Sequence, residues 1–332
     1  MKNYTPDNIV NLTLVGHASS GKTTLAECLS VCSGTIKKAG SVDGGTTISD
    51  YRKQEIKNQH SIAMSLLNLE YQDKKINIID TPGYLDFLGD MKAGLAVTEL
   101  ACFVLHSAEG IEMGTELAWE YSTDNKQSKI IIVNMFDRGD YNQIIASLRD
   151  RFGRQIFPIT SPLGKTDDIF TKLSDVLRKE TLEFTADGSG NYTGKECDEA
   201  QKSELDSQHQ ELIELVAESD EELLEKFFEK GELTEEELRE GLKKAINNKD
   251  LIPVFCCDLK TNVGTKRLLD FISKYVPSAA EVEGFTAKDS SGNEIKVKPS
   301  DPMLSAYVFK TLSEEHVGEL SFFKVVSGKL FP

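Results

Sequence analysis

The stretch that decides the fold is Gly16-His17-Ala18-Ser19-Ser20-Gly21-Lys22-Thr23, which matches the phosphate-binding pattern GxxxxGK[ST]. A β-branched run, Asn11–Val15, precedes it, and a helical pattern, Lys22–Val31, follows it. A strand, a glycine-rich turn and a helix in this order point backbone amides at a phosphate from the helix N-terminus. The stretch therefore predicts a P-loop nucleotide-binding domain.

The loop's polar side chains have separate expected roles. Lys22 would span the β- and γ-phosphates, Thr23 would coordinate Mg²⁺, and Thr24 can reach the α-phosphate. We expect nucleotide contacts throughout Gly16–Thr24. The loop alone does not distinguish ATP from GTP.

Strand and helix patterns alternate outward from this loop. Strands are expected at Ile62–Tyr71, Lys75–Asp80, Ala101–Ser107, Lys129–Asn134 and Gln155–Thr160, and helices at Asp86–Thr98, Met113–Asp124 and Tyr141–Arg151. A last strand, Ile252–Cys256, and a last helix, Val263–Tyr275, follow much later. This alternation predicts an α/β fold, a doubly wound, mostly parallel sheet that an insertion interrupts. The nucleotide-binding domain would comprise residues 1–157 and 251–280.

The insertion, residues 158–250, begins with irregular polar sequence and continues with helical signals. Ser219–Glu222 and Thr234–Glu237 are typical of capping boxes, and Gly231 stands where the first helix should end. Residues 198–245 hold 17 acidic and 6 basic residues, a net charge of −11. This helical α/β subdomain is either a solvated acidic face or a docking surface for a basic partner.

Residues 281–332 begin as a polar linker and continue with two alternating runs, Leu304–Thr311 and Leu320–Val326. Alternation predicts antiparallel strands, and two strands cannot bury a core alone. We therefore expect the first strands of an incomplete antiparallel β-barrel domain, and a truncated chain.

Composition limits the classes of function. The 332 residues are 39% hydrophobic and 28% charged, as in soluble globular proteins. No apolar run approaches the roughly 20 residues that span a bilayer, and the first residues carry no export signal. The net charge of −16 excludes a uniformly basic nucleic-acid binder. We expect a cytoplasmic protein with no membrane contact.

The stretch Asp80-Thr81-Pro82-Gly83 selects the class of nucleotide enzyme. It ends a strand that can lie beside the strand of the P-loop. Asp80 would hold the Mg²⁺ shell, and the Gly83 amide can bind a γ-phosphate and sense its hydrolysis. At this distance after a P-loop the stretch predicts a GTPase.

The stretch Asn134-Met135-Phe136-Asp137 is similar to the guanine-recognition pattern NKxD. In that pattern the aspartate, here Asp137, binds guanine N1 and N2, and the asparagine, here Asn134, ties the base loop to the P-loop. Met135 replaces the lysine that usually covers the base, and its thioether can pack on the ring without a cationic contribution. The stretch favours GTP and GDP as ligands.

Several segments together resemble elongation factor G, a family of translational GTPases. They are Gly16–Thr24, Gly40–Gly45, Ile76–Phe87, Pro253–Gly264, Ala306–Lys310 and Ser321–Gly328. The resemblance implies a ribosome-associated factor that hydrolyses GTP and moves or separates ribosomal complexes. It also implies that the acidic insertion meets a ribosomal stalk protein, and that RNA is contacted mainly through domains not in this chain.

The departures from that family indicate a divergent paralogue. Ser61 stands where the family has a switch threonine, and its hydroxyl can still coordinate Mg²⁺. Tyr84 stands where the family has a histidine that positions the attacking water, and Ser19 replaces a P-loop aspartate. Near Asp258 the family's Ser-Ala base contact is absent, although a backbone amide can serve there. The resemblance thus assigns catalysis to Lys22, Gly83 and Tyr84, and metal binding to Thr23, Ser61 and Asp80.

Three alternatives stay open. The first keeps GTP binding and action on ribosomes but has slow or absent hydrolysis. The second is a P-loop ATPase or nucleotide kinase, which Asp80–Gly83, Asn134 and Asp137 disfavour. The third clears ribosomes instead of translocating them, and nothing in the sequence discriminates it.

Overall fold

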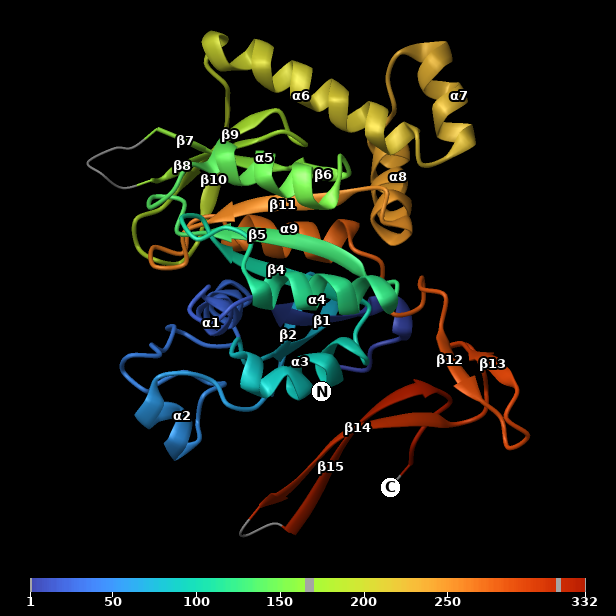
Figure 1. Ribbon diagram of the computed structural model, residues 1–332. Coiled ribbons are helices and arrows are strands. Elements are labelled where there is room, and N and C mark those ends of the chain that lie inside the picture. Colours follow the sequence, from blue (N-terminus) through green and yellow to red (C-terminus); the bar gives the residue numbers. More distant parts are fainter. Residues whose placement is uncertain (1, 165–169, 315–317, 332) are drawn as a thin grey trace.

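The computed structural model describes residues 2–164, 170–314 and 318–331, and a seven-stranded sheet lies at its centre (Figure 1). In spatial order the strands are β2 (Ser65–Tyr71), β3 (Lys74–Asp80), β1 (Ile9–Val15), β4 (Leu100–His106), β5 (Ser128–Asn134), β11 (Ile252–Cys257) and β6 (Ile156–Pro158). Strand β2 is antiparallel to β3, and every other neighbouring pair is parallel. The mostly parallel sheet that the sequence predicts is confirmed.

Helices pack on both faces of this sheet because its strands are apolar on both sides. In β4, Cys102 and Val104 belong to one apolar core, whereas Phe103 and Leu105 belong to the other. The first core includes α1 (Lys22–Cys32) and α9 (Thr265–Tyr275); the second includes α3 (Leu88–Leu95), α4 (Met113–Asp124) and α5 (Tyr141–Phe152). The doubly wound arrangement is therefore also confirmed.

The segment between β6 and β11 forms a second sheet and three helices at one end of the molecule (Figure 1). Its elements are β7 (Thr160–Leu163), β8 (Lys172–Asp175), β9 (Glu180–Phe184), β10 (Tyr192–Glu196), α6 (Glu199–Ala217), α7 (Glu221–Lys230) and α8 (Glu235–Asn248). The four strands are antiparallel, in the order β10-β9-β8-β7. The expectation of irregular sequence at the start of the insertion was wrong, because its strands have only four or five residues each, too few for an apolar alternation to stand out.

The helix ends of the insertion agree with those predicted from the sequence, except that one N-cap is shifted by a residue. Thr234 and Glu237 form the predicted capping box of α8, and Gly231 ends α7 in the left-handed conformation, with φ at 75°. The box predicted at Ser219 is wrong by one residue. Asp220 caps α7 by accepting from Glu222 N and Leu223 N, whereas the Ser219 hydroxyl donates back to the Val216 carbonyl.

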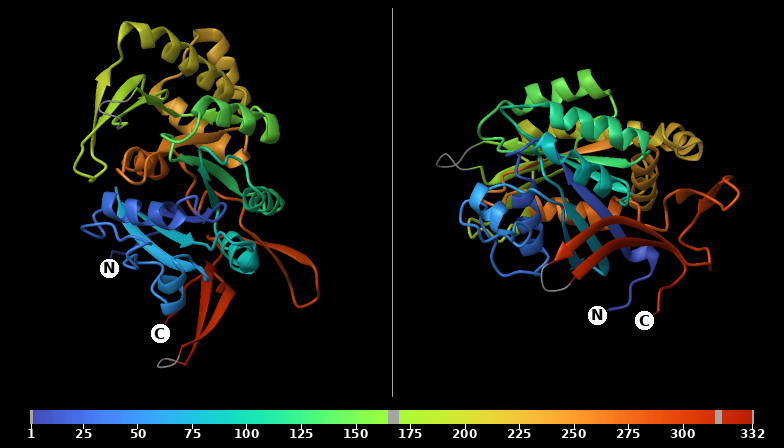
Figure 2. Two further views of the ribbon diagram at one scale, coloured as in Figure 1. Left: turned by 60° about the vertical axis from the view of Figure 1, so that its left-hand side comes forward. Right: turned by 60° about the horizontal axis from the view of Figure 1, so that its bottom comes forward.

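Two hairpins follow the nucleotide-binding region and lie at the opposite end from the insertion helices (Figures 1 and 2). They pair β12 (Phe285–Lys288) with β13 (Glu294–Val297), and β14 (Ser305–Glu314) with β15 (Gly318–Ser327). The predicted antiparallel strands are present, and the described residues form no closed barrel. Lys310 of β14 contacts Asp90 of α3, and Lys324 of β15 contacts Glu99.

Further predicted boundaries were wrong, among them the starts of one helix and one strand. The helix expected from Asp86 begins as a 3-10 turn, η2 (Leu85–Phe87), before α3. The strand expected from Ile62 begins only at Ser65, because the amides of Ile62 and Ala63 donate to the Glu55 carboxylate on α2 (Lys53–Asn58). One more 3-10 turn, η1 (Pro6–Asn8), precedes β1. Within the ranges that the structure describes, no helix is long and apolar enough to cross a membrane.

Candidate nucleotide-binding site

The P-loop connects the end of β1 to the start of α1, and its glycines permit tight approaches. Gly16 has φ at 140°, and a Cβ there would lie 2.3 Å from the Val104 carbonyl oxygen. Gly21 has φ at 103°, and a Cβ there would lie 2.4 Å from Asn134 Nδ2. Any other residue at these positions would push the loop away from β4 and from the loop after β5.

The Lys22 ammonium is held inside this loop by two carbonyls. Its Nζ donates to Gly16 O at 3.0 Å and to His17 O at 2.7 Å, and the side chain is only 6% exposed. Burial lowers the pKa of Lys22 to about 8, although the nearby Asp80 carboxylate acts in the opposite direction. A Cβ on Gly83 would lie 2.4 Å from this Nζ, so the loop after β3 reaches the lysine directly.

The three predicted metal ligands lie together beside the lysine. Thr23 Oγ1 donates to Asp80 Oδ2 at 2.7 Å and lies 3.2 Å from Ser61 Oγ. Asp80 Oδ1 is buried and has no hydrogen-bond partner among the described residues, and burial raises the pKa of Asp80 to about 6. Hydroxyl and carboxylate oxygens are ligands that Mg²⁺ prefers, and an unpaired buried carboxylate oxygen fits a cation.

Asp50 lines the same cavity as the predicted residues and is a candidate site residue that the sequence analysis missed. It is 4% exposed, and neither of its carboxylate oxygens has a hydrogen-bond partner within the described ranges. Burial raises its pKa, and its charge in turn raises the pKa values of Lys22 and Asp80. Its only sequence signal is a lone carboxylate in an irregular segment, so no pattern singled it out.

Asn134 joins three loops around the expected base position. Its Nδ2 donates to the Ser20 carbonyl at 2.9 Å, and its Oδ1 accepts from Met135 N at 2.8 Å and from Leu259 N at 3.3 Å. Met135 itself adopts a left-handed φ of 56°. The loop after β5 is thereby fixed against both the P-loop and the loop after β11.

The Asp258 carboxylate closes its own loop. It accepts from Lys260 N at 3.1 Å and from Thr261 Oγ1 at 2.7 Å. The contact from this segment to Asn134 comes instead from the backbone of Leu259, which is 4% exposed.

A cavity of about 780 Å³ unites these loops. Of the predicted site residues it is lined by Ala18, Ser19, Gly21, Lys22, Thr23, Thr24, Ser61, Gly83, Tyr84, Asn134, Met135, Asp137 and Asp258. The other predicted residues, Gly16, His17, Ser20 and Asp80, do not line it. Asp80 contacts the wall of the cavity through its hydrogen bond with Thr23. The His17 ring instead faces Glu112, with Nε2 3.3 Å from Oε1.

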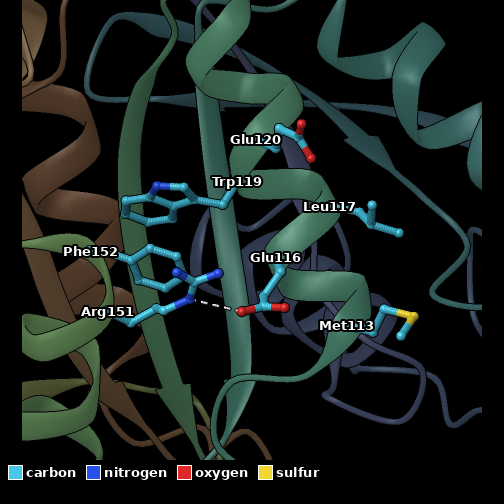
Figure 3. Close-up of a pocket in the computed structure, with 7 residues that line it drawn as sticks. All are labelled: Met113, Glu116, Leu117, Trp119, Glu120, Arg151 and Phe152. Atoms are coloured by element: carbon cyan, nitrogen blue, oxygen red, sulfur yellow. Dashed lines mark hydrogen bonds and ion pairs between the residues drawn. The ribbon is translucent and has the colours of Figure 1, made fainter.

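A second hollow, of about 420 Å³, lies between α4 and α5 and contains none of the predicted residues (Figure 3). Trp119 stacks on Phe152 with ring centroids 3.8 Å apart, and Arg151 Nε donates to Glu116 at 2.8 Å. Trp119, Phe152, Arg151 and Glu116 thus have their partners on the walls of this hollow.

The chain is similar to known proteins over most of its length. The model of the elongation factor Tu GTP binding domain matches residues 7–278. A crystal structure of a protein from Thermus thermophilus is similar, with a TM-score of 0.87 and 28% identity. That match covers 98% of this chain and 46% of the Thermus chain, so this chain spans about half of that protein's length. Together they confirm the resemblance to a translational GTPase of the elongation factor G type.

Proposed function

The chain belongs to the family of the elongation factor Tu GTP binding domain, and we propose that it acts on the ribosome with GTP hydrolysis as its switch. One observation carries this proposal. The P-loop lysine, the oxygens of Thr23, Asp80 and Ser61, and the loop tied by Asn134 surround one cavity. A site for phosphates, a site for a cation and a site for a base are therefore adjacent.

Phosphate and metal binding would divide between two groups of side chains. Lys22 would exchange its two carbonyl contacts for β- and γ-phosphate oxygens, which are stronger partners for an ammonium group. Thr23, Ser61 and Asp80 would hold Mg²⁺, and the unpaired Asp80 Oδ1 supports that role. When held there, the ion would supply positive charge that stabilises the negative charge of the phosphates.

Base selection would depend on Asp137, which is exposed on the cavity wall next to Met135. A carboxylate there can accept from guanine N1 and N2, whereas adenine offers no donor at N1. Asn134 keeps this loop in position through Ser20 and Leu259.

The switch would comprise two segments, residues 34–61 and 81–100. Asp90 lies within the second segment, and its Oδ2 accepts from Met64 N, just beyond the first segment, at 2.6 Å and from Lys310 Nζ at 2.8 Å. One carboxylate on α3 thus contacts both the segment that follows Ser61 and the β14–β15 hairpin. A change at the γ-phosphate could therefore alter the position of that hairpin.

Hydrolysis would be slow, even on ribosomes, because Tyr84 replaces the family's histidine. A phenol hydroxyl can donate and accept hydrogen bonds and so orient water, but unlike an imidazole it offers no positively charged form. This favours a second candidate, a GTP-gated ribosome factor for translocation or for disassembly with weak or absent hydrolysis.

The acidic insertion supplies the proposed ribosomal contact. Helices α7 and α8 carry clustered glutamates at their first turns, and the exposed fraction of Phe228 on α7 is 77%. An acidic surface with an exposed aromatic ring suits a basic partner, such as a ribosomal stalk protein. We place this function in the cytoplasm.

Two measurements on the full chain test the proposal. Labelled GTP should be displaced by GTP and GDP but not by equal concentrations of ATP, and displacement by ATP would support the kinase or ATPase alternative. Single-turnover hydrolysis with and without ribosomes then separates the two GTP-dependent candidates. An unchanged rate with ribosomes would reject hydrolysis as the ribosomal switch.

A further inference from the structure

We propose that His60 supplies the imidazole that position 84 lacks, and that its Nε2 orients the attacking water together with the Tyr84 hydroxyl. The inference rests on the proposed GTP-binding function and adds a residue that neither the sequence patterns nor the family resemblance assigned.

The first observation is the contact between the two rings. The His60 and Tyr84 ring centroids lie 4.7 Å apart, with the planes inclined at 58°. Both residues line the nucleotide cavity, together with Lys22 and Gly83. Of the four histidines in the described part of the chain, His60 is the one that lines this cavity. An imidazole therefore reaches the site although the residue after Gly83 is a tyrosine.

The second observation is the orientation of the imidazole. His60 Nδ1 lies 3.2 Å from the Ser61 carbonyl oxygen. A carbonyl can only accept a hydrogen bond, so Nδ1 must carry the hydrogen. In the neutral ring Nε2 is then left with a lone pair, and it can accept a hydrogen bond from water without any change of protonation.

The third observation is how firmly the residue is held. The His60 amide donates to Glu55 O at 3.3 Å, beyond a left-handed Gln59 that ends α2. On its other side Ser61 Oγ lies 3.2 Å from Thr23 Oγ1, and the Phe87 ring is 6.3 Å from the imidazole. His60 is thus fixed between a helix end and the proposed metal ligands, and a positioned acceptor is what in-line attack requires.

The atoms and charges of the proposed step balance without any transfer of a proton to His60. The water oxygen bonds to the γ-phosphorus while the bond from that phosphorus to the β–γ bridging oxygen breaks. The bridging oxygen keeps the electron pair and leaves as part of GDP. The proton that the water loses goes to a γ-phosphate oxygen, giving dihydrogen phosphate. His60 Nε2 and the Tyr84 hydroxyl only hold the water in line.

The test is single-turnover GTP hydrolysis on ribosomes by the full chain, with GTP affinity measured separately. We expect His60→Ala to lower the rate constant by about 10²-fold. The Kd for GTP should change by less than about threefold, and added imidazole should restore part of the rate. His60→Gln, which keeps a hydrogen-bond acceptor, should retain more activity than His60→Ala.

The matched control is His209→Ala. His209 Nδ1 also contacts a backbone carbonyl, that of Val176 at 2.8 Å, but it lies on α6 outside the cavity. Because α6 belongs to the insertion proposed to contact the ribosome, this variant is compared with the wild type without ribosomes, where its rate of hydrolysis and its Kd for GTP should be unchanged.

The outcomes separate the two proposals. A wild-type chain that does not bind GTP overturns the proposed function. A His60→Ala variant as fast as the wild type overturns the role of His60 alone. A chain that binds GTP but hydrolyses none overturns both that role and the hydrolytic switch, and leaves the GTP-gated candidate. A slow His60→Ala variant that imidazole does not rescue assigns His60 to structure and also overturns that role.

Discussion

The polar side chains of the nucleotide cavity differ mainly in whether the protein already gives them a hydrogen-bond partner. Lys22 and Asn134 have protein partners, whereas Asp80 Oδ1 and both Asp50 oxygens are buried without one in the described structure. Unpaired buried carboxylates are costly, so they indicate where a cation would stabilise the protein. Motifs could predict Lys22, Asp80 and Asn134 because fixed spacing carries them. Asp50 and His60 come to the site through irregular chain, where spacing carries no information.

Lys22 is expected to be essential for nucleotide affinity. The variant Lys22→Ala should weaken GTP binding by about 10²-fold or more, because it removes charged hydrogen bonds of about 1.5–3 kcal/mol each. Isothermal titration measures this. Lys129→Ala is the control, since burial lowers the pKa of Lys129 to about 8 as well, yet that residue lies under Trp119 outside the cavity. Affinity within a few-fold of wild type for Lys22→Ala would contradict the P-loop assignment.

Asp137 is expected to select guanine. A site that pairs a polar group with a base edge can reject the wrong partner by up to about 10⁴–10⁵, because the group is left unpaired. The variant Asp137→Asn should shift the preference from GTP toward XTP in a competition assay. Asp140→Asn controls for the same chemical change, since Asp140 caps α5 and asparagine caps equally well. An unaltered competition ratio would reject the assignment of Asp137.

Tyr84 is expected to limit the rate of hydrolysis and to leave affinity intact. Its ring is 43% exposed at the cavity, so the site can accommodate another ring. The variant Tyr84→His should raise ribosome-stimulated hydrolysis, whereas Tyr84→Phe should lower it by removing the hydroxyl. Rapid-quench kinetics measure both. If Tyr84→Phe hydrolyses GTP as fast as the wild type, the hydroxyl has no part in the reaction.

At the scale of helices and strands, the sequence predicted best those strands that are buried on both faces of the sheet. Strands β1, β4, β5 and β11 are rich in apolar residues, almost fully buried, and lie between helices, so their runs were visible in the sequence. Strand β10 is mostly exposed, and α2 has six residues with Glu55 as its buried side chain. Neither carries an apolar period. The insertion's sheet was missed because its four strands have only four or five residues each.

The glutamates at the start of α7 are expected to attract a basic ribosomal partner. Reversing the charge at Glu221, Glu222 and Glu225 should slow association with ribosomes at low salt and flatten its salt dependence. Stopped-flow measurements at several salt concentrations test this. The control is the same reversal at exposed acidic residues outside the insertion, namely Glu70, Glu109 and Asp124. Equal association rates for the wild type and the α7 variant would favour a solvated face.

At the scale of the whole molecule, buried polar contacts join the insertion to the nucleotide-binding sheet. Asp175 on β8 pairs with Arg267 on α9, and the two side chains are 0% and 1% exposed. One turn further along α9, Asp270 accepts from Tyr71 at the end of β2 and from Tyr192 on β10. Helix α9 therefore connects the edge of the central sheet with the second sheet. No sequence pattern could predict this, because the partners are far apart along the chain.

The Arg267–Asp175 pair yields a prediction for stability. The guanidinium lies over the rings of Phe255 and Phe271, so water cannot replace a lost partner. The variant Arg267→Met would leave Asp175 charged and buried, which costs about 3–5 kcal/mol. The double variant Arg267→Met, Asp175→Leu removes both charges and should recover most of that loss. Urea unfolding, followed by circular dichroism, measures the free energy of unfolding of each.

The control is Arg151→Met, which breaks an ion pair with Glu116 whose side chains are 59% and 44% exposed. Exposed pairs contribute about 0–1 kcal/mol, so this variant should unfold like the wild type. If Arg267→Met were equally mild, α9 would not be what holds the insertion. If the double variant stayed as unstable as the single one, the loss would come from the packing of Arg267 against the two rings. Recovery in the double variant alone would identify the unpaired Asp175 charge as the cause.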